Sequence, residues 1–210
     1  METSHLSQAF QDGLKIEDAD FGEIALRHYP LGELMLPTGK VVACDPFVFP
    51  ETPPFTLDLP PGSYPVIACV ADFTSNGDHR VAYAILRLST QEPVRWEMAT
   101  RPEQDMSTLE EGYIFGYPVD AGTGCFMDAE AATALEKKLT TNEDYAETLI
   151  DEFYGDEDIA RLNLVLDPET GVNSIFFPSG WGDGFYASYW GYAADNTIAC
   201  LVTDFGVLPD

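Results

Sequence analysis

Apolar and polar residues along much of this chain alternate with the period of two that is typical of β-strands. Residues 94–98 show this alternation, with apolar side chains at every second position and charged side chains between them. Apolar runs at 64–73 and 79–89 are separated by a turn that contains Asn76-Gly77, which predicts a β-hairpin. A further hairpin is predicted over 33–46, where a Pro-Thr-Gly-Lys turn divides two apolar runs.

Two helices are predicted in the middle of the chain. The first covers 129–139 with Asp128 as its N-cap, and the second covers 143–153, where apolar residues recur at every fourth position. A short helix with Ser4 as its N-cap is predicted within the first dozen residues. The proline-rich segment 47–65 is expected to be a loop or an edge with at most a short strand. More strands are predicted at 162–167, 172–177, 185–192 and 197–205.

The order of these elements indicates an α+β fold. We expect a mostly antiparallel β-sheet or sandwich, with the helical pair of about 128–153 packed on it. The chain has 210 residues, and the β pattern continues on both sides of the helical pair. We therefore expect one domain that covers residues 1–210.

The charge of the chain limits the partners that it can bind. The formal net charge is −26, and the 10 lysines and arginines are scattered. Such a surface repels phosphate backbones and anionic lipids, so we expect no binding to nucleic acid or membranes. The N-terminal residues lack the basic and apolar regions of a signal peptide, and the cysteines have no CxxC spacing. A cytoplasmic protein with buried, reduced thiols is expected.

The acidic residues concentrate in one part of the chain. Residues 101–160 contain 16 acidic and 3 basic residues, a net charge of −13. Within the second predicted helix, Glu143, Glu147 and Asp151 recur at every fourth position and form an acidic stripe. The stripe is either a surface that binds a basic protein or a solvated face of an acidic protein.

Glycine-flanked acids mark a candidate site in the segment 119–128. Asp120 precedes Gly122 and Gly124, and Asp128 follows before the predicted helix. Glycines permit tight turns and a close approach to a ligand. The third glycine of a dinucleotide fingerprint and the lysine of a phosphate loop are both absent. The alternatives are a divalent-cation site and a tight turn followed by a helix cap.

A second glycine-rich segment, 179–184, contains Trp181 and Asp183. Its neighbouring aromatic residues would form either a ligand wall or part of the core. Asp45 and Asp204 each follow an apolar strand, and they join the candidate site if the fold brings them close to the other acids. In that arrangement Mg²⁺ or Ca²⁺ would bind the following residues: Asp120, Asp128 and Asp183.

Several of these segments resemble one family. The motifs are ACDPF (43–47), VDAGTGCFMD (119–128), SGWGDG (179–184), YWG (189–191) and LVTDF (201–205). Their order and spacing are similar to those of a bacterial family known as domain-of-unknown-function family 4241, over nearly the whole chain. The resemblance implies a bacterial, cytoplasmic protein and directs attention to these loops, but it implies no activity.

Three functions are compatible with these observations. The first is an acidic interaction protein that binds a basic partner, as immunity proteins bind toxins. The alternative is a divalent-metal-dependent hydrolase or small-molecule-binding enzyme, with its carboxylates on the glycine-rich loops. A third is a structural subunit whose aromatic segment 185–192 forms an interface.

Overall fold

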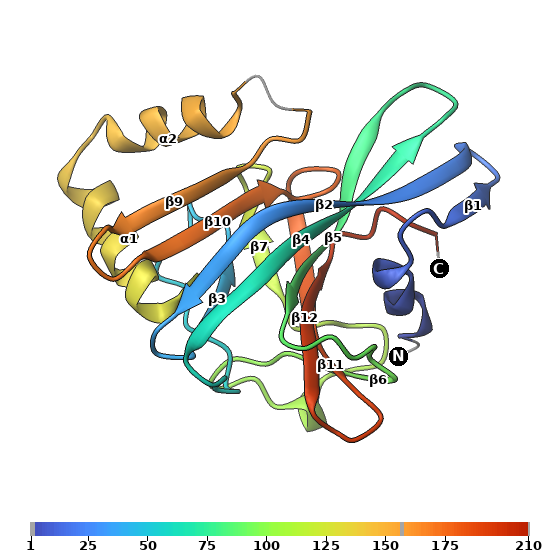
Figure 1. Cartoon of the computed structure of the whole chain (residues 1–210), viewed down its shortest axis with the longest axis horizontal. Coiled ribbons are helices and arrows are strands. Elements are labelled where there is room, and N and C mark those ends of the chain that lie inside the picture. Colours follow the sequence, from blue (N-terminus) through green and yellow to red (C-terminus); the bar gives the residue numbers. More distant parts are fainter. Residues whose placement is uncertain (1–2, 156–157, 210) are drawn as a thin grey trace.

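The computed structural model describes residues 3–155 and 158–209, and these residues form two antiparallel β-sheets, two α-helices and two short 3-10 helices (Figure 1). The larger sheet has the order β1 (Lys15–Asp18), β2 (Gly22–Leu36), β4 (Gly62–Phe73), β5 (His79–Arg87), β12 (Ile198–Asp204), β11 (Gly184–Tyr192) and β6 (Arg95–Met98), and β7 (Tyr117–Val119) also pairs with β11. The smaller sheet has the order β3 (Val41–Cys44), β8 (Thr123–Asp128), β10 (Val172–Pro178) and β9 (Leu162–Asp167). The predicted α+β class is confirmed.

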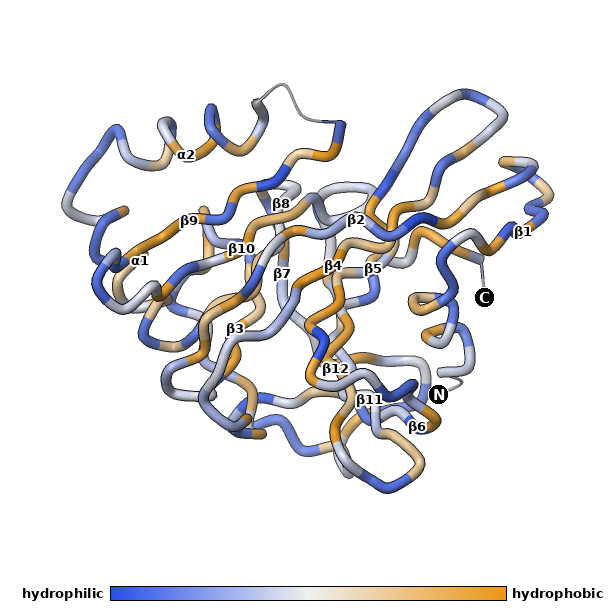
Figure 2. Tube along the Cα trace, viewed as in Figure 1, coloured by the Kyte–Doolittle hydropathy of each residue, from blue (hydrophilic) through white to orange (hydrophobic). Residues whose placement is uncertain are grey.

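Both sheets contribute to one apolar cluster. Leu34 and Ile85 come from the larger sheet, whereas Phe126 and Ile175 come from the smaller one. The apolar stretches of the strands gather in the interior of the molecule (Figure 2). Side chains alternate between the two faces of a strand, so a strand of the smaller sheet can contribute to a different cluster on its other face.

The helices cover that other face of the smaller sheet. The helix α1 (Ala129–Thr141) and the helix α2 (Tyr145–Phe153) lie beside β9 and β10, at the opposite end of the molecule from β1 (Figure 1). Leu135 of α1 and Phe153 of α2 pack in a second cluster with Phe176 of β10. The predicted helical pair is therefore confirmed, although α2 begins at Tyr145 and not at residue 143.

The hairpin predicted over 33–46 is wrong. The strand β2 pairs with β1 and β4, whereas β3 pairs with β8 in the other sheet. The turn between them is fixed by distant partners, because the Thr38 amide donates to Asp128 Oδ2 at 3.0 Å and Leu59 N donates to the Gly39 carbonyl at 2.8 Å. The two apolar runs thus belong to different sheets, and the turn between them connects the sheets. The hairpin predicted at 64–89 is present as β4 and β5.

The N-terminal helix is a 3-10 helix, η1 (Ser4–Phe10), and its N-cap is Thr3 and not the predicted Ser4. Its Leu6 and Ala9 side chains are fully buried. The other 3-10 helix, η2 (Met106–Thr108), interrupts the loop between β6 and β7. The segment 47–65 contains only an isolated bridge between Lys40 and Asp58 before β4 begins. The four cysteines are buried.

Candidate functional site

Asp45 connects two loops through its buried carboxylate. The residue follows β3 and is completely inaccessible to solvent. Its Oδ1 accepts from the amides of Phe47 at 2.9 Å and Val48 at 3.3 Å. Its Oδ2 accepts from the amides of Asp120 at 3.0 Å and Ala121 at 2.7 Å. All four donors are backbone groups, so Asp45 positions the loop after β7 and presents no free surface to a ligand.

The two glycine-rich segments lie against each other, and we call them the paired glycine loops (120–122 and 179–183). The Gly122 amide donates to Asp183 Oδ1 at 3.2 Å, and the Ser179 amide donates to the Gly122 carbonyl at 3.1 Å. Gly122 has a φ of 60° and Gly182 a φ of 108°, a region that L side chains rarely adopt. The side chains of Asp120 and Asp183 are exposed. The structure therefore brings together Asp45, Asp120, Gly122 and Asp183.

Asp128 lies elsewhere, because the predicted glycine loop does not lead directly into α1. Gly124 belongs to β8, and this strand carries the chain about 16 Å from Thr123 to Asp128 at about 3.3 Å per residue. Asp128 accepts from the Glu130 amide at 2.9 Å as the N-cap of α1, and from the Thr38 hydroxyl at 2.8 Å. Its carboxylate is completely buried by these contacts. Of the two alternatives left open for Asp128, the structure shows the helix cap.

Gly124 has a packing role. A Cβ at this position would lie 2.8 Å from Cε2 of Phe177 on the neighbouring strand β10. Within residues 3–155 and 158–209, no group of three or more His, Cys, Asp or Glu side chains is placed to hold a metal ion. The predicted metal ligands Asp120, Asp128 and Asp183 thus do not converge, since a strand separates Asp128 from the paired glycine loops.

Trp181 lies on the outside of the paired glycine loops. Its side chain is 46% exposed, and its ring stacks on Phe21 with a centroid distance of 5.8 Å. Phe73 of β4 packs at 5.6 Å, and the Arg80 guanidinium lies 5.3 Å from the ring centroid. The indole therefore covers the end of β4 and β5.

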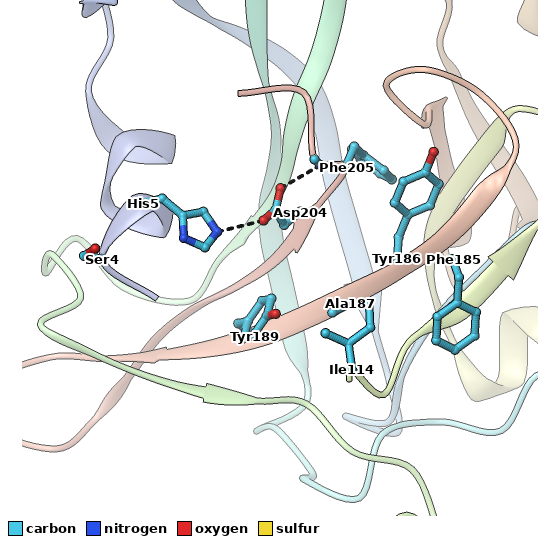
Figure 3. Close-up of a pocket in the computed structure, with 10 residues that line it drawn as sticks. Ser4, His5, Ile114, Phe185, Tyr186, Ala187, Tyr189, Asp204 and Phe205 are labelled. Carbon is cyan, nitrogen blue, oxygen red and sulfur yellow. Dashed lines mark hydrogen bonds and ion pairs between the residues drawn. The ribbon is translucent and has the colours of Figure 1, made fainter. Parts of the chain in front are cut away.

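Asp204 lines a pocket of about 700 Å³ between η1 and the strands β11 and β12 (Figure 3). His5 Nε2 lies 2.9 Å from Asp204 Oδ2, and the Gly206 amide donates to Asp204 Oδ1 at 2.9 Å. We call this cavity the His5–Asp204 pocket. Its lining consists of Ser4, His5, Ile114, Phe185, Tyr186, Ala187, Tyr189, Asp204, Phe205 and Gly206.

Two tyrosines of β11 beside the pocket have raised pKa values. Burial raises the pKa of Tyr189 to about 12, and the Asp204 carboxylate acts in the same direction. Burial and the charge of Asp183 also raise the pKa of Tyr186. The Tyr186 hydroxyl donates to the Gly182 carbonyl at 2.8 Å, so this side chain connects the pocket with the paired glycine loops.

His5 and Tyr189 are not among the site residues that the sequence predicts. His5 is 199 residues away from its partner Asp204, and its surroundings predict only a short helix. Tyr189 belongs to a strand whose aromatic residues are equally typical of a core. No local spacing indicates that the two side chains line one pocket.

The predicted partner-binding residues are all exposed. Glu143 precedes α2, whereas Glu147 and Asp151 lie within it. None of them forms an ion pair with another residue that the structure describes. We call these three residues the acidic face.

Comparison with known proteins places the chain in a family. Residues 34–203 match the family described as "Protein of unknown function (DUF4241)", so the chain belongs to this family. No curated protein and no solved structure matches the chain. The matched segment includes the paired glycine loops and the acidic face, whereas Asp204 directly follows it and His5 lies well before it. No helix in the described part of the chain has the length and apolar character that crossing a membrane requires.

Proposed function

We propose that this protein binds a basic protein partner through the acidic face. The observation that carries the proposal is the exposure of Glu143, Glu147 and Asp151, which form no ion pair within the described residues, in a chain of net charge −26. Half of that charge belongs to residues 101–160. A concentrated field of one sign accelerates the approach of an oppositely charged protein.

The helix α2 presents these carboxylates on a fixed platform. Leu149 and Phe153 are buried against the smaller sheet and α1, which orients the opposite face of the helix toward solvent. A partner would therefore meet carboxylates whose backbone positions are already set. Such preorganisation lowers the entropic cost of association.

The acidic residue Asp151, near the end of α2, does not stabilise the helix. Glu147 lies in the first turn, where a negative charge interacts favourably with the helix dipole. Asp151 lies four residues further on, and the last turn contains no basic residue. Like charges at this spacing destabilise a helix by about 0.2–0.5 kcal/mol per pair. A role in binding accounts for a charge that local stability does not favour.

Matched charge variants test the proposal. The acidic-face variant carries Glu143→Gln, Glu147→Gln and Asp151→Asn. The control variant carries Glu17→Gln, Asp20→Asn and Glu111→Gln, which removes the same charge from exposed positions without ion pairs. The probe is a short peptide of alternating lysine and arginine, and its affinity is measured by calorimetry at about 0.1 M salt.

We expect the acidic-face variant to bind this peptide about tenfold more weakly than the wild type, because three favourable charge contacts are removed. The control variant is expected to stay within about threefold of the wild type, since it changes only the long-range field. Equal losses in the two variants would show that total charge, and not the acidic face, determines binding.

A further inference from the structure

The His5–Asp204 pocket has the chemistry of a site for an organic cation. Four of the ten residues that line it are aromatic, namely Phe185, Tyr186, Tyr189 and Phe205. The faces of aromatic rings carry partial negative charge and attract ammonium and guanidinium groups. The carboxylate of Asp204 lies among these rings with 19% of its side chain exposed. The pocket thus combines an anionic group with aromatic side chains.

No lysine or arginine is found among the ten residues that line the pocket. His5 carries a charge only when it is protonated, and its Nε2 contacts Asp204. Burial raises the pKa of Tyr186, and the negative charge of Asp183 outside the lining acts in the same direction. An anionic ligand would therefore meet the Asp204 carboxylate in a protein of net charge −26. The charges favour a cation over an anion.

We infer that the His5–Asp204 pocket receives the side chain of an arginine or lysine from the basic partner. The alkyl chain would lie against Phe185 and Ile114, and the cationic group would lie between the Tyr189 ring and Asp204. The volume of about 700 Å³ falls within the range of about 300–1,000 Å³ that small-ligand sites occupy. This inference rests on the proposed function, since the partner supplies the side chain.

The structure suggests how such an anchor would be positioned. Asp204 is held by His5 from η1 and by the Gly206 amide, so its carboxylate is fixed before a ligand arrives. Tyr186 is held by the Gly182 carbonyl in the same way. A carboxylate has about four acceptor positions, so these two contacts leave capacity for a guanidinium donor.

The first experiment compares two small probes of similar shape, one charged and one neutral. Butylguanidinium carries a guanidinium on a butyl chain, and butylurea is its neutral counterpart. Both are titrated into the wild-type protein near pH 8. We expect butylguanidinium to bind at least about tenfold more tightly than butylurea. Equal binding of the two probes, or no binding of either, would overturn the inference.

A charge-removing variant locates the binding. Asp204→Asn keeps the shape of the side chain and is expected to lower butylguanidinium affinity about tenfold. Asp195→Asn removes a carboxylate from the turn at the other end of the β11–β12 hairpin and is expected to have no effect. An unchanged affinity in Asp204→Asn would refute the assignment. If Asp204→Asn does not fold, the comparison of the two probes on the wild type still decides the matter.

Competition identifies the source of the cation. We expect the lysine–arginine peptide to displace butylguanidinium from the wild-type protein. Binding of butylguanidinium without displacement would overturn the partner side chain as the occupant and indicate a free small cation. The acidic-face variant separates this inference from the proposed function: its affinity for butylguanidinium is expected to equal that of the wild type. If the acidic face does not bind the peptide, the butylguanidinium titration keeps its expected result. If the pocket does not bind butylguanidinium, the comparison of the acidic-face variant with the control variant keeps its expected result.

Discussion

Replacing Asp45 by asparagine should strongly destabilise the fold, although the substitution adds no bulk. The carboxylate is completely buried and accepts four backbone N–H groups, two on each oxygen. An asparagine side chain retains one oxygen, which can keep one of these pairs. Its NH₂ group would face the other two N–H donors. Two hydrogen bonds are thus lost in either orientation of the amide.

The size of the effect follows from these contacts. A hydrogen bond to a charged group contributes about 1.5–3 kcal/mol, and a buried donor without a partner is destabilising by a similar amount. Loss of two such bonds should lower the free energy of unfolding by about 3–6 kcal/mol. Typical domains are stable by about 5–15 kcal/mol, so the variant should fold only marginally.

Urea denaturation followed by circular dichroism measures this change by linear extrapolation. Asp183→Asn serves as the control, because Asp183 is exposed and accepts a single bond of 3.2 Å from Gly122. Its effect should be within about 0.5 kcal/mol. A loss of less than about 1 kcal/mol in Asp45→Asn would refute the structural role assigned to this carboxylate.

Three more changes test other parts of the structure by the same denaturation assay. Asp128→Ala should lower stability by about 2–4 kcal/mol, because it removes the N-cap of α1 and leaves Thr38 without its partner, and Asp128→Asn should recover part of the loss. Arg101→Met should lower the free energy of unfolding by about 3–5 kcal/mol, since this buried guanidinium donates to three backbone carbonyls. Arg101→Lys should not restore stability, because a lysine cannot reproduce that geometry. Burial raises the pKa values of Cys69 and Cys200 to about 12. As the pH rises, the thiols of the unfolded chain therefore lose their protons before those of the folded protein. The free energy of unfolding should fall from about pH 9 to pH 12 as a result. From pH 8 to pH 10 the two thiols should contribute a loss of about 2–3 kcal/mol, and a Cys69→Ala, Cys200→Ala variant should show a correspondingly flatter profile; equal profiles would contradict the assignment.

Local patterns predict the elements of this fold well where the interactions are local. The hairpin of β4 and β5 follows from its apolar runs and its Asn-Gly turn. The start of α1 follows from Asp128, whose side chain caps the next residues. Strand pairing between the sheets is different, because a period of two identifies a strand but not its partner. The false hairpin at 33–46 arises from this limit.

The candidate site shows the same division. The glycines and acids of 119–128 and 179–184 indicate two special turns, and the structure places these turns side by side. The strand between Asp120 and Asp128 separates two acids that are close in sequence. Conversely, His5 and Asp204 are at opposite ends of the chain and meet in one pocket. Such contacts depend on the order of strands in the sheet, which no spacing in the sequence encodes.

In the function that we propose, the acidic face guides a basic partner to this protein. The most direct measurement is the association rate of the lysine–arginine peptide with the wild type, the acidic-face variant and the control variant, followed from about 0.1 M to about 1 M salt. We predict that the acidic-face variant associates more slowly than the control variant at low salt, and that the three rates converge at high salt, where charges are screened beyond about 3 Å. Rates that do not depend on salt, or that are equal in the two variants at every salt concentration, would contradict this role of the acidic face.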